Sequence, residues 1–255
     1  MSGPKITVVT VCYNAEREIG RTIQSVIDQT YDNVEYIIVD GASSDGTMTE
    51  IKKYHNRISK IVSEPDSGIY NAMNKAAQMA TGEWINYMNA GDSFASDNVL
   101  ADVFGNEIQS DIAVIYGASN FVYSFGSVCI APESELRFNR RLPFSHQSSF
   151  VRSDILKKWG FDEQYKVLAD LDFFRRLAIN NYHFMLVKTV VSNYAQGGYS
   201  QQNALRMFNE NEIIQGTMGS IGYYCRLAKE LLRLLILKIT PNPILNLIRR
   251  KRYAK

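Results

Sequence analysis

The sequence has few of the residues that build transition-metal centres and disulfide frameworks. Among its 255 residues are three cysteines and three histidines. Cys12, Cys129 and Cys225 stand far apart in the chain and form no CxxC pair. Neither a disulfide framework nor a zinc site is therefore predicted, and a reducing cytoplasm is expected. The kind of metal site that remains possible with this composition is a hard cation bound by oxygen ligands.

Long apolar runs and a strong charge of one sign are also absent. The sequence contains no run of about eighteen uncharged apolar residues, so no membrane-spanning helix is predicted. Residues 1–9 have no signal-peptide core, which favours a cytoplasmic location. The formal net charge is only +2. Nucleic-acid binding is not expected, because it draws on a large basic excess.

Apolar strand patterns alternate with helix patterns along the N-terminal part of the chain. The strands are expected at residues 5–14, 34–47, 57–64 and 83–92, and the helices at 15–29, around Ile51 and at 67–80. Continuous β-branched runs are typical of strands that are covered on both faces. The alternation predicts an α/β fold with a parallel, doubly wound sheet, in which Asn14 caps the first helix.

Polar residues stand where these strands end, at the edge where such sheets bind their ligands. Asp40 is either a hydrogen-bond acceptor for a nucleotide or an acid that closes a turn, and Asp45 is the better candidate for a helix cap. Asp92 follows Gly91 and is either a ligand of a divalent cation on a diphosphate or a turn acid. One carboxylate suffices for the first alternative, since Mg²⁺ commonly takes one or two and completes its shell with phosphate oxygens and waters.

Two acids open a helix that is predicted at residues 170–181. Asp170 and Asp172 are two residues apart and point to different faces of that helix. Either one of them faces a cleft, where a carboxylate suits general-base catalysis, or both serve the helix dipole. His146 is a lone histidine that follows a proline-containing loop, and a histidine of this kind is more often a structural hydrogen-bonding residue than a catalyst.

The chain after Ser200 is predicted to be helical and basic. Leucines alternate with basic residues over 223–255, and the last basic cluster is Arg249, Arg250, Lys251 and Arg252. This segment is either a helix packed on the preceding domain or an amphipathic helix on an anionic membrane surface. Pro241 and Pro243 interrupt it, which favours lying on the bilayer over spanning it.

Three stretches together resemble the family 2 glycosyltransferases, which have the GT-A fold. They are residues 6–47, 63–92 and 146–177, and the likeness extends over about 5–200. The stretch 64–76 also resembles a bacterial subgroup that makes capsule, colanic-acid and O-antigen polysaccharides. The resemblance implies a Rossmann-like, mostly parallel doubly wound sheet with a helical C-terminal appendage.

The same resemblance implies a division of the chain. A catalytic domain would cover residues 1–200, with a nucleotide-binding half at about 1–95 and an acceptor half at about 96–200. A helical, basic extension would follow at 201–255. The stretch "GGYS" at 197–200 is expected to be a mobile loop over the donor, because glycine permits hinge motion.

The resemblance also implies contacts for a nucleotide-sugar donor. Residues expected to line the nucleotide pocket, receive a uracil-type base or lie near the diphosphate are Thr10, Cys12, Tyr13, Asp40, Asn74, Lys75 and Asn89. Asn74 and Lys75 fall in the family's "xxN" helix motif. Asp92 matches the last acid of an extended DxD motif and would bind Mn²⁺ or Mg²⁺. Asp170 matches the first acid of the "EDxD" motif and would be the general base.

The sequence departs from the family pattern in three places. Asn89 and Gly91 stand where other members have aspartates, and Ala169 replaces the glutamate before the base. No QxxRW motif follows, which argues against a processive synthase. The activity implied is inverting transfer of a hexosyl or N-acetylhexosaminyl group from a nucleotide sugar, most simply a UDP-sugar, to a glycan or lipid-linked acceptor.

Two other functions compete with this interpretation. A sugar-nucleotide-forming nucleotidyltransferase has a similar sheet, but it needs a glycine-rich loop after the first strand, where this chain reads "VCYNAERE". A non-catalytic relative that binds a nucleotide sugar is supported only by the absence of aspartates at positions 89 and 91 of the DxD-like motif. The location expected for the enzyme is cytoplasmic, with peripheral contact to the inner face of the plasma membrane. The sequence makes no prediction of the oligomeric state.

Overall fold

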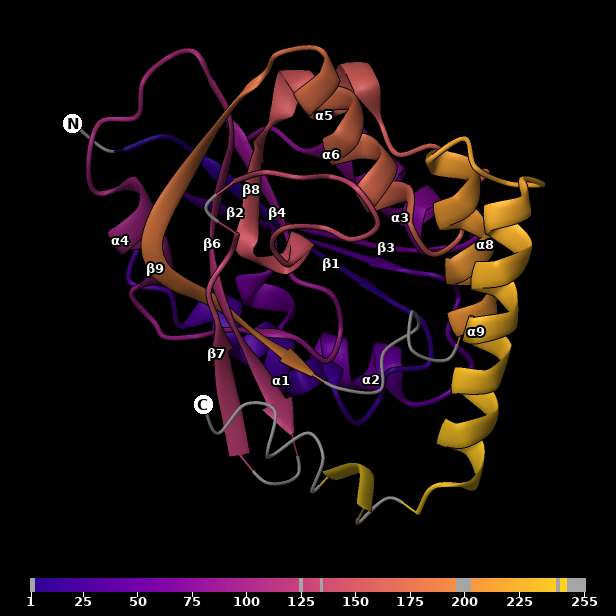
Figure 1. Ribbon diagram of the computed structural model, residues 1–255. Coiled ribbons are helices and arrows are strands. Elements are labelled where there is room, and N and C mark those ends of the chain that lie inside the picture. The colour runs from indigo at the N-terminus through magenta and orange to yellow at the C-terminus, as the bar shows by residue number, and fades with distance from the viewer. Residues whose placement is uncertain (1–2, 124–125, 134, 196–202, 242–243, 247–255) are drawn as a thin grey trace.

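The computed structural model describes residues 3–123, 126–133, 135–195, 203–241 and 244–246 (Figure 1). The strands are β1 (Ile6–Cys12), β2 (Val34–Asp40), β3 (Lys60–Ser63), β4 (Trp84–Tyr87), β5 (Ser93–Phe94), β6 (Ile112–Tyr123), β7 (Gly126–Ile130), β8 (Ser149–Arg152) and β9 (His183–Ala195). The helices are α1 (Ile19–Ile27), α2 (Thr47–Lys52), α3 (Ile69–Met79), α4 (Val99–Phe104), α5 (Ser153–Trp159), α6 (Ala169–Ile179), α8 (Ala204–Ile214) and α9 (Ile221–Ile239), with 3₁₀ turns η1 (His55–Arg57) and η2 (His146–Ser148). The predicted loop at 197–200 and the basic cluster at 249–252 lie outside the described residues.

The described strands join one sheet in the order β3-β2-β1-β4-β8-β6-β9-β5, and β7 pairs with β6. β1 pairs in parallel with β2 and β4, and β2 pairs in parallel with β3. The second half of the sheet is mixed, because β8 is antiparallel to β4 and β6, whereas β9 is parallel to β6. Parallel pairing is thus confirmed for the first four strands, whereas the later ones are joined by both antiparallel and parallel pairing.

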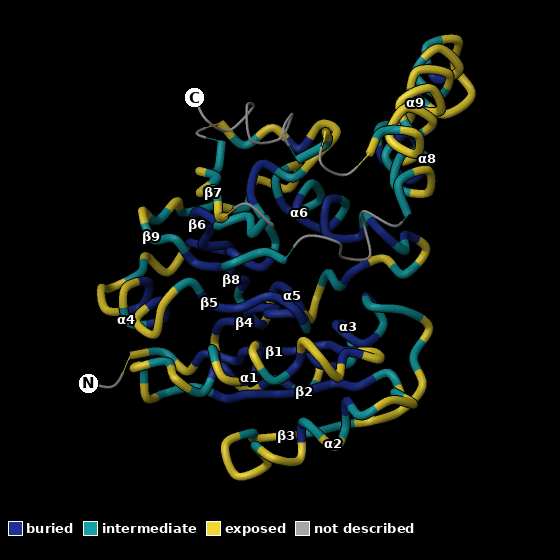
Figure 2. Tube along the Cα trace, turned by 90° about the horizontal axis from the view of Figure 1, so that it is seen from below, coloured by how far each residue is buried: buried dark blue, intermediate teal, exposed yellow. Residues whose placement is uncertain are grey.

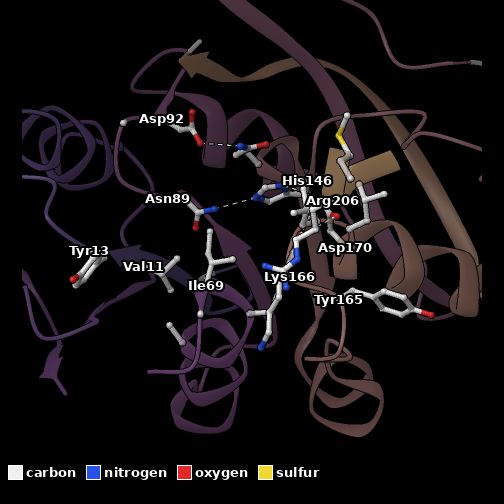
Figure 3. Close-up of a pocket in the computed structure, with 18 of the residues that line it drawn as sticks. Val11, Tyr13, Ile69, Asn89, Asp92, His146, Tyr165, Lys166, Asp170 and Arg206 are labelled. Atoms are coloured by element: carbon white, nitrogen blue, oxygen red, sulfur yellow. Dashed lines mark hydrogen bonds and ion pairs between the residues drawn. The ribbon is translucent and has the colours of Figure 1, made fainter. Parts of the chain in front are cut away.

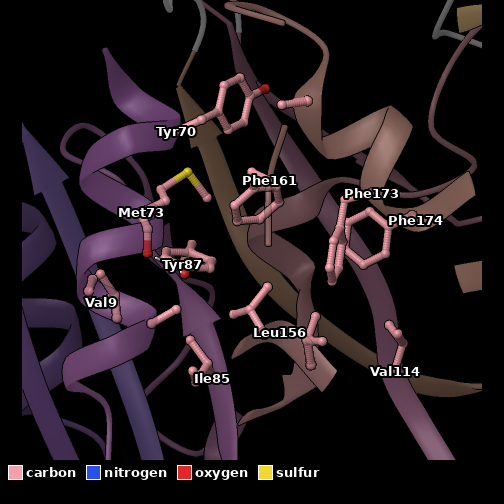
Figure 4. Packing of buried hydrophobic residues seen from close by; sticks show 14 of the residues in the cluster. Val9, Tyr70, Met73, Ile85, Tyr87, Val114, Leu156, Phe161, Phe173 and Phe174 are labelled. Atoms are coloured by element: carbon pink, nitrogen blue, oxygen red, sulfur yellow. Dashed lines mark hydrogen bonds between the residues drawn. The ribbon is translucent and has the colours of Figure 1, made fainter. Parts of the chain in front are cut away.

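β1 is buried along its whole length because helices cover both faces of the sheet. Ile6 and Val8 pack in a cluster with Ile23 of α1. Val9 points to the opposite face, since side chains alternate along a strand, and packs in a second cluster with Met73 of α3 (Figure 4). Burial of each such side chain contributes about 1.5–3 kcal/mol. The two clusters confirm the predicted doubly wound arrangement.

The predicted cap of the first helix is wrong. α1 begins at Ile19 instead of directly after Asn14, and no side chain caps its first turn. Asn14 has a left-handed φ of 48°, and its Oδ1 accepts a hydrogen bond from the backbone N–H of Ser44 at 3.0 Å. Asn14 therefore joins the loops that follow β1 and β2. Asp45 does act at a helix start, because its Oδ1 accepts from the N–H of Thr47 at 3.0 Å.

Two buried acids anchor α8 to the rest of the protein. Glu210 accepts hydrogen bonds from the consecutive backbone N–H groups of residues 166–168, which lead directly into α6. Glu212 is fully buried and pairs with Arg140 and with Arg226 of α9. Charged hydrogen bonds of this kind are about twice as strong as neutral ones. α8 therefore holds the segment from which α6 begins.

α9 is the least buried of the described helices, and its packing partner is α8. Figure 2 shows it projecting from the body with most of its length exposed. Ile221, Leu232 and Ile239 are 87%, 58% and 70% exposed, respectively. Within the described ranges, every helix is too short or too polar to span a bilayer.

Candidate active site

A cleft of about 1090 Å³ opens at the carboxyl ends of β1 and β4. Its lining includes the ends of these strands, the start of α3, the end of β9, η2, the segment before α6, and residues of α8 and α9. Figure 3 shows Tyr13 toward one end of the cleft and Asp170 and Arg206 toward the other. The position agrees with the general rule that α/β sheets bind ligands at the carboxyl ends of their strands.

The cleft brings together part of the predicted set of site residues. Those that line it are Cys12, Tyr13, Asn89, Asp92 and Asp170. Those that the structure places outside its lining are Thr10, Asp40, Asn74 and Lys75. The predicted metal ligand and the predicted base therefore share one cavity, while the predicted nucleotide contacts are divided between its lining and the surrounding structure.

Thr10 and Asp40 have protein partners for their side-chain oxygens. The Asp40 carboxylate is fully buried and accepts from the backbone N–H of Ser43 at 3.0 Å and from Oγ of Ser63 at 2.7 Å. Oγ1 of Thr10 donates to the carbonyl of Met88 at 2.8 Å. The contacts of Asp40 are those expected of an acid that closes a turn, which is one of the two alternatives given for it. Roles of the two residues at a nucleotide stay predictions.

Asn74 and Lys75 tie α3 to neighbouring loops. The Asn74 amide donates to the carbonyl of Phe161 and accepts from its N–H, each at 2.9 Å. Nζ of Lys75 lies 2.7 Å from a carboxylate oxygen of Glu64. These contacts fix α3, whose first turn borders the cleft. A direct contact of either side chain with a diphosphate stays a prediction.

Asp92 occupies the turn between β4 and β5. Its Oδ1 accepts from the backbone N–H of Ala195 at 3.0 Å, and its Oδ2 accepts from Nε2 of Gln147 at 2.8 Å. Burial raises the pKa of the Asp92 carboxyl, although these two hydrogen bonds oppose the rise. Gly91 has a φ of 101°, a backbone conformation that favours glycine. This turn therefore explains why glycine stands where an aspartate was expected.

A divalent cation fits the oxygen atoms at this end of the cleft. Oδ1 of Asn89 is buried and has no hydrogen-bond partner among the described residues, an unfavourable state unless a ligand takes it up. No group of three His, Cys, Asp or Glu side chains in the described ranges could hold a metal. Asp92, Asn89 and the oxygens of a diphosphate would together satisfy Mg²⁺ or Mn²⁺, which prefer oxygen ligands.

Asp170 faces the cleft from the first turn of α6. Its Oδ1 accepts from the hydroxyl of Tyr70 at 3.1 Å and from the N–H of Leu171 at 2.9 Å. Asp172 points elsewhere and accepts from Nε of Arg176 at 2.7 Å, one turn along the helix. The prediction that the two acids have different surroundings is confirmed, and Asp170 is the one in the cleft.

His146 is the site residue that sequence reasoning missed. It was expected to be structural, yet it lines the cleft and lies between Asn89 and Asp170 (Figure 3). Its Nε2 is 3.1 Å from Nδ2 of Asn89, and its Nδ1 is 3.2 Å from Oδ2 of Asp170. These residues come from distant parts of the chain, so no sequence spacing could reveal the contact.

Curated relatives of this chain are bacterial glycosyltransferases. A PGL/p-HBAD biosynthesis glycosyltransferase of Mycobacterium tuberculosis is 29% identical over 183 residues, which cover 68% of this chain and 69% of the relative. TuaG of Bacillus subtilis, whose name assigns it to teichuronic acid biosynthesis, is 35% identical over 99 residues, or 38% of this chain and 39% of TuaG.

Solved structures share the fold at lower identity. S. aureus TarS (residues 1–349) in complex with UDP gives a TM-score of 0.66 at 20% identity over 82% of this chain and 65% of that one. The mannosyltransferase PcManGT of Pyrobaculum calidifontis with GDP-Man and Mn²⁺ gives 0.63 at 17% identity over 98% of this chain and 79% of that one. These likenesses confirm the GT-A fold. Residues 7–142 match the family described as glycosyl transferase family 2. Since this match covers more than half of the chain, the chain belongs to that family.

Proposed function

We propose that this protein is an inverting glycosyltransferase that uses a UDP-sugar donor in the synthesis of bacterial surface polysaccharide. The observation that carries the proposal is the placement of Asp92 and Asp170 in one cleft with different partners. Asp92 shares the cleft with the buried Oδ1 of Asn89, which has no hydrogen-bond partner among the described residues, and these oxygens suit a cation on the diphosphate. Asp170 contacts Tyr70 and His146 instead, and it suits the acceptor.

The reaction that follows is a single displacement. Asp170 accepts the proton of an acceptor hydroxyl while that oxygen forms a bond to the anomeric carbon of the donor. The bond from this carbon to the diphosphate oxygen breaks on the opposite face, and the configuration inverts. A divalent cation held by Asp92 and Oδ1 of Asn89 would offset the charge of the departing diphosphate.

The thiol at the donor end of the cleft is a poor candidate for a covalent nucleophile. Burial, together with the adjacent Asp40 carboxylate, raises the pKa of the Cys12 thiol. The thiolate is the reactive form of cysteine, so this side chain stays inert in the protein. Its chemistry supports direct attack by the acceptor over a two-step mechanism through a thiol.

The choice of donor and acceptor rests on what the similar proteins bind or make. TarS, which shares the fold, was solved with UDP, whereas PcManGT was solved with GDP-Man. The name of TuaG assigns it to teichuronic acid biosynthesis, and that of the mycobacterial relative to PGL/p-HBAD biosynthesis. We therefore propose a hexosyl or N-acetylhexosaminyl donor carried by UDP, and a glycan or lipid-linked acceptor.

We further propose that α9 lies on the anionic inner leaflet of the plasma membrane. Its large exposed apolar side chains are Ile221, Tyr224, Leu231, Leu232, Leu235, Ile236, Leu237 and Ile239. Basic residues along the same helix are Arg226, Lys229, Arg233 and Lys238, against the single acid Glu230. This charge suits anionic headgroups better than a second copy of the same basic helix. Because α8 and α9 also line the cleft, a lipid-linked acceptor would reach Asp170 from the membrane side.

The two competing functions make different predictions. A nucleotidyltransferase needs a glycine-rich loop after β1, and residues 13–18 of this chain contain no glycine. A non-catalytic binding protein has no use for a carboxylate that is held in the cleft by Tyr70. Metal-dependent turnover of a nucleotide sugar separates this last alternative from an enzyme.

The test combines binding and transfer. Thermal unfolding is measured with UDP, GDP and a panel of nucleotide sugars, each with and without Mn²⁺. A ligand at about a hundred times its Kd adds roughly 2.7 kcal/mol of stability. Sugars that bind are then assayed for transfer to cell-envelope lipid extracts, and the anomeric configuration of the product is read by NMR. Retention of configuration, or stabilisation by GDP but not by UDP, would overturn the corresponding part of the proposal.

A further inference from the structure

One short turn, η2, contacts both of the acids in the cleft. Gln147 donates to Oδ2 of Asp92 at 2.8 Å, and the preceding residue, His146, places Nδ1 3.2 Å from Oδ2 of Asp170. The turn itself is fixed, because the amide of Asn86 donates to the carbonyl of Gln147 at 3.0 Å. Two neighbouring side chains on a rigid turn therefore address the two ends of the active site.

The contacts of His146 favour one tautomer of its neutral ring. The Nδ2 group of Asn89 can only donate, so Nε2 of His146 accepts this hydrogen bond at 3.1 Å. The proton of the neutral ring is then on Nδ1, which faces Asp170. In histidine the hydrogen bond at one nitrogen sets the state of the other. The other amide atom of Asn89, Oδ1, has no hydrogen-bond partner among the described residues and is the one that the proposed function gives to the cation.

We propose that His146 is a positioning residue for the base. Its Nδ1–H would hold the Asp170 carboxylate in the orientation that takes the proton of the acceptor, and Asn89 would select the tautomer that makes this possible. The inference rests on the proposed function, in which Asp170 is the base. It assigns a second task to Asn89, because the same amide that offers an oxygen to the cation orients the ring.

The hydrogen bonds of Asp170 indicate which of its two carboxylate oxygens would accept the proton of the acceptor hydroxyl. Oδ1 accepts from both Tyr70 and Leu171, and a carboxylate oxygen has about two acceptor sites. Oδ2 lies 3.2 Å from Nδ1 of His146 and, among the described residues, accepts no hydrogen bond from any other group. One acceptor site of Oδ2 is therefore left for the acceptor hydroxyl, and its direction depends on the ring of His146.

Two substitutions at the same position separate positioning from packing. His146→Leu keeps an apolar side chain of similar bulk but removes the donor. His146→Asn keeps an N–H donor near the position of Nδ1. We expect kcat to fall about tenfold in the leucine variant, which corresponds to a loss of about 1.4 kcal/mol in transition-state stabilisation. The asparagine variant should recover most of that loss, with donor KM and UDP affinity within about twofold of wild type in both.

The tautomer is measured directly by ¹⁵N NMR of the full-length protein with UDP and diamagnetic Mg²⁺. The chain has only three histidines, so the signal of His146 is assigned as the one that the leucine variant lacks. We expect the Nδ1–H form, and a loss of this preference in Asn89→Ala. An Nε2–H ring in wild type, or equal kcat values in the leucine and wild-type enzymes, would overturn the inference. The NMR result stands without turnover, so an absence of any transfer would count against the proposed function alone.

Discussion

β1 and α9 are similarly rich in apolar residues, and the protein uses them in opposite ways. Every residue of β1 is buried, whereas Tyr223 is the one buried residue in the described stretch of α9. Burial contributes about 25 cal/mol per Å² of apolar surface. The apolar residues of β1 therefore stabilise the fold, and those of α9 remain free to stabilise contact with a partner. Apolar composition alone does not distinguish the two uses.

The cleft lies between the buried sheet and the exposed helix. One of its two acids is positioned by the sheet, and the other is positioned by the helical part of the protein. Asp92 follows β4, so its position depends on the buried sheet. Asp170 begins α6, and the segment before that helix is held by Glu210 of α8. Substitutions near the sheet should therefore affect cation binding, and those near α6 and α8 should affect the base and its support. The effects are given from the largest expected to the smallest.

The largest effect is expected at the sheet side. Asp92→Ala should abolish measurable transfer and weaken binding of UDP in the presence of Mn²⁺, because it removes the only carboxylate of the proposed cation site. Binding is measured by calorimetry with and without the metal. Asn89→Asp serves as the matched variant and should retain or tighten Mn²⁺ binding. Full turnover of the Asp92→Ala enzyme would show that the cation site is wrongly placed.

The next largest effect is expected at the base. Asp170→Asn should lower kcat by about 10² to 10⁴, the usual contribution of general-base catalysis, with nucleotide affinity close to normal. Asp172→Asn is the matched control on the same helix turn. It should mainly cost stability, because Asp172 pairs with Arg176. An inactive Asp172→Asn enzyme with intact binding, beside an active Asp170→Asn enzyme, would reverse the assignment.

A smaller effect on catalysis and a clear one on stability are expected at α8. Glu210→Ala should lower the free energy of unfolding by about 3 kcal/mol, since three backbone N–H groups lose a charged acceptor. Denaturant unfolding measures this change, and kcat should fall with it because residues 166–168 lead into α6. Glu230→Ala on α9 removes a surface pair with Arg233 and should change stability by less than about 0.5 kcal/mol. Equal effects of the Glu210→Ala and Glu230→Ala substitutions would mean that α8 does not support the position of Asp170.

The junction of α8 and α9 should make stability depend on acid pH. Hydrogen bonds from Arg226, helped by Thr217 and Arg140, lower the pKa of Glu212 from 4.5 to about 2. Since the folded-state pKa is below the unfolded one, this contribution is present above pH 4.5 and is lost as the pH falls toward 2. Tm measured across this range should fall less steeply in Glu212→Gln. Parallel curves for the two proteins would contradict the assignment.

The smallest effect on turnover, and the sharpest test of the exposed helix, is expected at α9. Leu232→Glu combined with Leu235→Glu should prevent sedimentation with anionic vesicles, while kcat with a water-soluble acceptor stays within about twofold. Neutral vesicles should bind the wild-type protein weakly, because basic residues contribute about 1 kcal/mol each near an anionic surface. Undiminished binding of the double variant would exclude this face, and a dimer in solution that the variant disrupts would identify a second copy as its partner.

Much of the sheet could be predicted from the sequence, since runs such as those of β1 and β2 are buried on both faces and are mostly apolar. The left-handed turns at Asn14 and Gly91 were not predicted, because a backbone conformation depends on contacts made by distant loops. The helix start at Asp170 and Asp172 left open which acid, if either, faces a cleft, and the family resemblance singled out Asp170. The place of His146 was not, because its two contacts span the sheet and are invisible to any local pattern.

The hydrogen bond from the backbone of Ala195 to Asp92 has a consequence for biosynthesis. The two residues are 103 positions apart, so the carboxylate acquires this partner only after β9 has left the ribosome and has joined β6. A chain that has made the first four strands already carries Asp92 but holds it incompletely. The hydrogen-bond donor is the backbone N–H of Ala195, so replacing the side chain of this residue leaves the bond in place. Proline, which has no backbone N–H, is the substitution that would remove it.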